Sequence, residues 1–251
     1  MSGHSKWSSI KHKKGAADAR RGKLFSKLSR AIIVAARESG ADPAANLALQ
    51  NAIEKARSYS MPKDNIERAI ARGTGADTAA ESFEQVVYEG YGPNGVAILV
   101  EALTDNRNRT AADVRAAFAK HDGNLGGSGA VAWLFERRGV ILVDADRFDE
   151  DDVTLAAAEG GAEDVEVDGS SFSVTSAPES LSAVRQALED AGIEVDSAEL
   201  TMVPKTTVEL DDENAAKKTL RLIDALEDSD DVQEVYANFD IPEQVMEAVA
   251  T

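Results

Sequence analysis

The stretch GVILVDADRFDEDDVTLAAAEGGAEDVEVDG (139–169), continued by SSFSVTSAPESLSAVRQALEDAGIEVDSAELTMV (170–203), decides the fold of this chain. Alternating apolar residues predict strands and 3/4 spacing predicts helices, in the order strand 140–143, helix 149–159, strand 165–167, strand 172–175, helix 178–191 and strand 193–203. The alternation of the last strand slips near Ser197, which predicts a bulge. The order βαββαβ predicts a ferredoxin-like unit.

The segments on either side of this unit are incomplete alone. Upstream, the pattern predicts a hairpin of strands 83–89 and 96–103, joined by the turn GYGPNG, and then a helix from about Arg107. Downstream it predicts a strand at 206–210, an amphipathic helix and a strand at 235–239. A hairpin with one helix lacks the layers of a domain, so residues 81–138 and 204–251 are expected to form one discontinuous α/β domain that holds 139–203 as an insertion.

The N-terminal part reads as a basic arm, residues 1–23, followed by a helical domain, residues 24–75. One helix is expected to end at Gly40, a second to begin with Asp42 as its N-cap, and a third to run from Pro62 to Gly73. The predicted fold class is therefore α+β multidomain, with an N-terminal three-helix domain plus two α/β sandwich domains.

Charge is strongly segregated along the chain. The whole sequence has a formal net charge of −18, yet its first 30 residues contain nine Lys or Arg and one acid, a local charge of +8. One reading is a solvated, poorly ordered tail; the other, favoured because Trp7 and His12 stand among the lysines, is an arm that binds nucleic acid. The candidate contacts are Lys6, Trp7, Lys11, His12, Lys13, Lys14, Arg20, Arg21, Lys23, Lys27 and Arg30.

A second candidate contact is LTDNRNRT at 103–110, where a helix begins. Arg107 and Arg109 oppose the helix dipole there, and a bound phosphate would explain their position, with Asn106 beside them. The alternative is that Asn106 or Asn108 caps the helix while the arginines pair with nearby aspartates. Local sequence leaves both readings open.

Several classes of protein fit the sequence poorly. The chain has no cysteine and its three histidines lack metal-ligand spacing, so no metal site and no cofactor are expected. The glycine-rich stretch 123–129 lacks the ending of a P-loop and reads as a flexible contact loop or hinge. No catalytic constellation stands out, and no apolar run is long enough to span a membrane, so a cytoplasmic, non-enzymatic protein is expected.

The acidic excess lies mainly in the predicted insertion, where residues 139–205 contain 17 acids and three bases. A solvated face that aids solubility is the preferred explanation. The alternatives are docking onto a basic ribosomal protein and folding back to shield the basic arm.

Motifs along nearly the whole chain resemble the YebC family. They are GHSKW at 3–7, KHKKGAADARRGKLFSKLSR at 11–30, DPAAN at 42–46, MPKDNIERAI at 61–70, YEGYGPNG at 88–95, LTDNRNRT at 103–110 and GNLGGSGAVAWLF at 123–135. The resemblance implies a three-domain cytoplasmic protein that is either a DNA-binding transcriptional regulator or a ribosome-associated translation factor that relieves stalling, related to the mitochondrial translational activator of cytochrome oxidase.

From residues and resemblance together, we expect a nucleic-acid-binding regulator of gene expression, a monomer or weak oligomer, with ribosomal RNA as its favoured target. Duplex DNA is the first alternative. A hydrolase acting on a nucleotide or on peptidyl-tRNA is the second.

Overall fold

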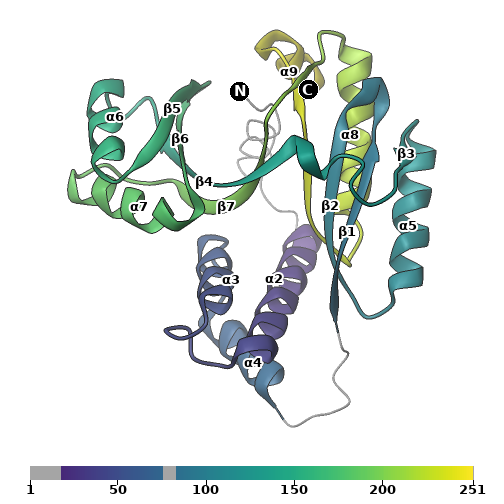
Figure 1. The fold of residues 1–251 in the computed structure, drawn as a ribbon, viewed down its shortest axis with the longest axis horizontal. Coiled ribbons are helices and arrows are strands. Elements are labelled where there is room, and N and C mark those ends of the chain that lie inside the picture. The colour runs from purple at the N-terminus through teal and green to yellow at the C-terminus, as the bar shows by residue number, and fades with distance from the viewer. Residues whose placement is uncertain (1–17, 76–82, 251) are drawn as a thin grey trace.

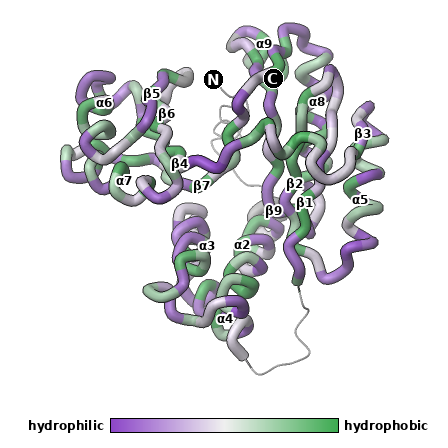
Figure 2. Tube along the Cα trace, viewed as in Figure 1, coloured by the Kyte–Doolittle hydropathy of each residue, from purple (hydrophilic) through white to green (hydrophobic). Residues whose placement is uncertain are grey.

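The computed structural model describes residues 18–75 and 83–250 and confirms the predicted fold class. A helical part lies beside a central sheet, and a second sheet with its own helices lies to one side (Figure 1). Long strands connect the two sheets, and the hydrophobic residues concentrate inside each part, most visibly along the centre of the main sheet (Figure 2).

The helical domain consists of α2 (Asp18–Ser39), α3 (Leu47–Ser58) and α4 (Lys63–Thr74). The apolar stripes of these helices meet in one core, whose fully buried members include Ile32, Leu49 and Ala56. Gly40 ends α2 in the left-handed region, at φ +93°, which a glycine adopts without strain. That end matches the prediction.

Three predicted boundaries in this domain are wrong. Helix α2 begins at Asp18, so the last residues assigned to the arm are helical; the apolar stripe, which starts only at Leu24, hides this start. The N-cap of α3 is Asn46, whose side chain accepts a hydrogen bond from the amide of Leu49 at 3.0 Å, whereas Asp42 caps a preceding turn. Gly73 lies inside α4, where a Cβ atom would stand 2.5 Å from a backbone oxygen of α2.

The central sheet has the order β3-β1-β2-β9, built from β1 (Glu84–Tyr91), β2 (Ala97–Thr104), β3 (Asn124–Leu125) and β9 (Val232–Ala237). Strands β1 and β2 form the predicted hairpin, and β2 also pairs with β9 from the far end of the chain. Helices α5 (Arg107–Lys120) and α8 (Glu213–Glu227) cover one face through buried residues such as Val114, Phe118 and Leu222.

Smaller elements complete this region. Strands β8 (Val208–Glu209) and β10 (Phe239–Asp240) form a short parallel pair, so the strand predicted at 206–210 is shorter than expected. The C-terminal helix α9 (Glu243–Ala250) packs against α8. Short 3₁₀ turns η1 (Pro93–Gly95) and η2 (Ala132–Leu134) close the hairpin and precede β4.

The ferredoxin-like unit contains β4 (Phe135–Asp144), α6 (Glu150–Glu159), β5 (Ala162–Asp168), β6 (Ser171–Ser176), the 3₁₀ turn η3 (Pro178–Ser180), α7 (Leu181–Asp190) and β7 (Ser197–Pro204). Its sheet order β5-β6-β4-β7 is antiparallel throughout, as βαββαβ requires. Its core is separate from that of the central sheet.

The predicted bulge near Ser197 is wrong. Strand β7 begins at Ser197 and pairs with β4 without a shift of register, from Leu142 opposite Ser197 to Phe135 opposite Pro204. The slipped alternation arises because residues 193–196 precede the strand. Both β4 and β7 extend toward the central sheet, where Phe135 joins a small core with Leu99, Val131 and Tyr236.

Candidate nucleic-acid interface

The predicted contacts fall into three groups by position. Lys6, Trp7, Lys11, His12, Lys13 and Lys14 lie outside the described residues. Arg20 and Arg21 lie in the first turns of α2. The remaining candidates belong to two places that the structure describes, the middle of α2 and the start of α5.

The cations in the middle of α2 contact the C-terminal end of α8, about 200 residues away in sequence. Lys27 Nζ donates to the carbonyl oxygen of Glu227 at 2.5 Å, and Lys23 Nζ donates to that of Asp228 at 3.2 Å. Arg30 donates to the carbonyl oxygen of Asp230 at 2.5 Å. Cations at the C-terminal end of a helix complement its dipole. In this conformation the three side chains therefore join the helical domain to the part of the chain built on the central sheet, which we call the central domain.

Asp231 is the centre of this junction. Its buried carboxylate accepts hydrogen bonds from Arg30 at 3.2 Å, Arg109 at 2.8 Å and Thr110 Oγ1 at 2.6 Å, with Thr104 Oγ1 at 3.3 Å. Burial alone raises the pKa of the Asp231 carboxyl, but the bonds from Arg109 and Thr110 outweigh it and hold that pKa below its ordinary value. One carboxylate thus ties α2, the end of β2 and the first turn of α5 together.

The start of α5 combines both readings of the sequence. Asn106 is the N-cap, its side chain accepting from the amide of Arg109 at 3.1 Å. Arg109 also pairs with Asp105 at 2.6 Å. For Asn106 and Arg109 the structure therefore has the alternative given by the sequence, in which an asparagine caps the helix and an arginine pairs with a nearby aspartate. Arg107 is different: it is exposed and forms no ion pair with any residue of 18–75 or 83–250.

Arg107 lies along a groove between α5 and the edge of β1. Arg115, two turns further along α5, is also exposed and makes no ion pair with a described residue. The opposite wall contains Tyr88, whose hydroxyl donates to the carbonyl oxygen of Arg107 at 3.4 Å. The end of the groove is formed by Gly127 and Ser128. Two exposed guanidinium groups on one helix suit the phosphates of a nucleic acid.

The loop at the end of the groove is held by a buried carboxylate, that of Glu89. Oε1 accepts from the amide of Gly129 at 2.7 Å, and Oε2 accepts from Val131 at 2.8 Å and Ala132 at 2.7 Å. Burial raises the pKa of Glu89, but these backbone bonds outweigh it and lower the pKa overall. The stretch 123–129, expected to be a flexible contact loop or hinge, is therefore tied to β1 through Gly129 and through the amide of Gly126, which donates to the carbonyl oxygen of Glu89.

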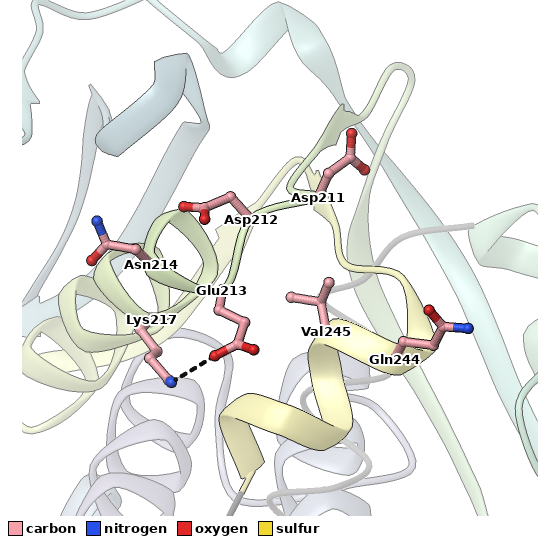
Figure 3. A pocket seen from close by; sticks show the side chains of 7 residues that line it. All are labelled: Asp211, Asp212, Glu213, Asn214, Lys217, Gln244 and Val245. Atoms are coloured by element: carbon pink, nitrogen blue, oxygen red, sulfur yellow. Dashed lines mark hydrogen bonds and ion pairs between the residues drawn. The ribbon is translucent and has the colours of Figure 1, made fainter.

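A second hollow lies between the start of α8 and α9 and has the opposite character. Its lining contains Asp211, Asp212 and Glu213, with Lys217 paired to Glu213 at 3.1 Å (Figure 3). The Asp212 carboxylate accepts from the amide of Ala215 and caps α8. Such a surface repels phosphates, so it is not part of the candidate interface.

Sequence reasoning found Arg107 and missed the residues that surround it. Arg115 could have been found, because it lies on the same helix two turns from Arg107. Glu89 and Asp231 gave no signal, since their partners lie about 40 and about 120 to 200 residues away. Among the residues that the structure describes, no group of acids and histidines could hold a metal ion, and no helix is long and apolar enough to cross a membrane.

Together these features define a class: a multidomain α+β protein with a helical domain joined to a two-sheet body, and a cationic groove on that body. The chain belongs to the TACO1/YebC family. Residues 5–76 match the family's N-terminal domain and residues 83–239 match its second and third domains.

Full-length relatives agree with this assignment. The chain is 62% identical over 250 residues to a protein of Rubrobacter xylanophilus and 56% identical over 251 residues to one of Persephonella marina, each comparison covering 100% of both chains. Both relatives are named probable transcriptional regulatory protein. The structure is also similar to the crystal structure of a conserved hypothetical protein from Aquifex aeolicus, with a TM-score of 0.80 and 50% identity over 90% of this chain and 93% of the other.

Proposed function

We propose that this protein is a nucleic-acid-binding regulator of gene expression that acts on the ribosome, where it binds ribosomal RNA and relieves stalling. The observation that carries the proposal is the segregation of charge: residues up to Gly75 contain 15 basic and six acidic side chains, and the rest contain 12 basic and 39 acidic ones. A molecule with one basic end suits RNA grooves that lie beside basic protein tails, whereas its acidic body opposes wrapping by long duplex.

In this proposal the arm and the groove make two separate contacts with RNA. The arm residues Lys6 to Lys14 supply the densest charge and anchor the protein to RNA. Arg107 and Arg115, two turns apart on α5, each hold a phosphate at a second region, on the central domain. Asn106 and Arg109 contribute indirectly, because they fix the first turn of α5 on which Arg107 stands.

The remaining expectations belong to the same proposal. The protein acts without catalysis and without a cofactor, in the cytoplasm, as a monomer or weak oligomer. The acidic face of the ferredoxin-like unit is a candidate contact for basic ribosomal proteins, given its 17 acids against three bases over residues 139–205.

The alternative is a DNA-binding transcriptional regulator. The names of the relatives favour it, and a basic arm fits a groove of duplex DNA as well. In that case Arg107 and Arg115 contact DNA phosphates.

The groove is tested by the double variant Arg107→Ala, Arg115→Ala. Each arginine that contacts a phosphate adds about one unit to the salt dependence of binding, so the variant should bind ribosomes more weakly, with a salt slope lower by about two. Its melting temperature should stay unchanged, because neither side chain pairs with a described residue. Arg185→Ala on α7, an exposed arginine paired with Glu189, shows the effect of removing one surface cation away from the groove. Equal ribosome affinity and slope in the double variant would remove the groove from the proposal.

A further inference from the structure

The loop that contains Gly127 and Ser128 continues into η2, which has an exposed aromatic side chain. Trp133 in η2 is 65% exposed, although tryptophan is among the costliest residues to leave in water. Tyr91, at the end of β1, is partly exposed as well. Neither ring belongs to a buried core of the described residues, so their position needs another reason.

Both rings are held in place through their polar atoms. Trp133 Nε1 donates to the carbonyl oxygen of Ala130 at 3.2 Å, and the Tyr91 hydroxyl donates to the same oxygen at 3.1 Å. The hydrogen-bonding group of each side chain is therefore used within the protein. What remains for a partner is the apolar surface of the ring.

The backbone before Trp133 is fixed by contacts with β1 and with a small core. Glu89 accepts from three amides of residues 129–132, and Val131, with no exposed surface, anchors the loop in the small core beside Leu99 and Phe135. Burial of a carboxylate is unfavourable unless hydrogen bonds replace its contacts with water, and the three amides supply those bonds here. The result is a rigid support for an exposed ring.

The loop runs from the groove, past the edge of β1, to the sheet face that carries Glu89 and Tyr91, where Trp133 is exposed. Gly127 and Ser128 line the groove with Arg107 and Arg115, and Trp133 follows Ser128 by five residues. Five residues span at most about 18 Å, so a short nucleic-acid segment can reach both. An apolar protein partner would leave the two guanidinium groups facing it unpaired, whereas a nucleotide strand supplies phosphates for them and bases for the ring.

From this juxtaposition we infer that the groove and Trp133 form a binding site for a single-stranded or looped-out RNA segment. One unpaired base stacks on the Trp133 indole while phosphates further along the same strand lie against Arg107 and Arg115. Bases inside a duplex are stacked on each other and offer no free face, so the site selects unpaired RNA. Glu89 is a positioning residue for the stack. The inference rests on the proposed function for its ligand class and adds to it which form of RNA the groove accepts.

The composition of the chain allows a direct test. Trp7 and Trp133 are its two tryptophans, so Trp7→Phe leaves Trp133 as the one indole fluorophore. A 12-nucleotide single-stranded RNA without self-complementarity should quench that emission, and the same sequence in a duplex should not. In the otherwise unchanged chain, Trp133→Ala should weaken binding of the single strand about 5- to 100-fold, Trp133→Phe much less, and neither should shift the melting temperature.

The outcomes separate this inference from the proposed function. Equal quenching by duplex and single strand, or no quenching by either, overturns the stacking site even if Trp7→Phe still associates with ribosomes. Quenching by the single strand without any ribosome association supports the stacking site and overturns the ribosomal function. If Trp133→Ala weakens ribosome association while free RNA never quenches, the ring contacts a protein and the inference is wrong.

Discussion

At the scale of residues, two buried carboxylates organise the candidate interface. Glu89 fixes the loop that ends the groove, and Asp231 fixes the helix start that carries Arg107. Each accepts several hydrogen bonds, which is the condition under which a buried carboxylate is stable. The side chains proposed to face a ligand and those that hold them are thus different residues, and only the first kind can be recognised from local sequence.

Replacement of Asp231 by Ala should lower the free energy of unfolding by about 2–3 kcal/mol, because Arg30 and Thr110 lose their shared acceptor in a buried place. Asp230→Ala is the matched control: its side chain is exposed and its contact with Arg30 uses the backbone, so we expect a change within about 0.5 kcal/mol. Denaturant titration of both variants measures this. Equal effects would show that Asp231 is not the centre of the junction.

The same residue predicts a dependence on pH. The pKa of Asp231 is about 3.8 in the unfolded chain and lower in the folded one, so its contribution to stability is complete above that value and is lost as the pH falls through the folded pKa. The free energy of unfolding should therefore decrease on acidification below about pH 4. Asp231→Asn should reduce the steepness of this decrease. Parallel curves for the variant and the parent protein would contradict the assignment.

At the scale of elements, hydrophobic periodicity predicted which helices and strands exist, and it failed where a residue has a tertiary role. Gly73 looks like a helix stop but lies inside α4, because α2 approaches it closely. Asn46 caps α3 and also donates to the carbonyl oxygens of Ala35 and Gly40, at 2.8 Å each, a role that Asp42 cannot fill from its place in the turn. Such choices depend on the neighbouring helix, which local sequence does not contain.

A pair of glycine substitutions tests this packing. Gly73→Ala should destabilise the helical domain by about 1–3 kcal/mol, since its methyl group would meet the backbone oxygen of Ile33 and the Cβ of Ala36. Gly22→Ala in α2 meets no atom within 4 Å and should stabilise the domain by about 0.5–1 kcal/mol. Thermal or denaturant unfolding measures both. A neutral Gly73→Ala would mean that the two helices are further apart than described.

At the scale of the whole molecule, the fold class was predictable because each part has its own periodic signal, including the βαββαβ order of residues 139–203. The way the parts meet was not predictable. Lys27 contacts Glu227 from 200 residues away, and Lys55 of α3 pairs with Glu234 of β9 and, at 3.7 Å, with Glu199 of β7. Charges on a helix surface look solvated in sequence, and only the folded chain shows which of them join domains.

Independence of the ferredoxin-like unit is a prediction at this scale. Residues 139–203 expressed alone should unfold cooperatively, since Ile141, Val153, Phe172 and Leu188 form a core that needs no other part of the chain. Deletion of residues 204–251 should instead unfold the central domain, because it removes β9 and α8 from that sheet and its core. Amide chemical-shift dispersion of the two truncated chains measures this. A disordered 139–203 fragment would refute the prediction.

The central claim is that this protein acts on ribosomal RNA through its basic end. The measurement that tests it most directly is co-sedimentation of the full chain with ribosomes, beside binding to promoter-length duplex DNA at the same physiological salt. We expect ribosome association that is largely lost on deletion of residues 2–17, which removes four lysines, and only weak duplex binding without sequence preference. Tight, sequence-selective duplex binding with no ribosome association would contradict the account and establish the transcriptional alternative.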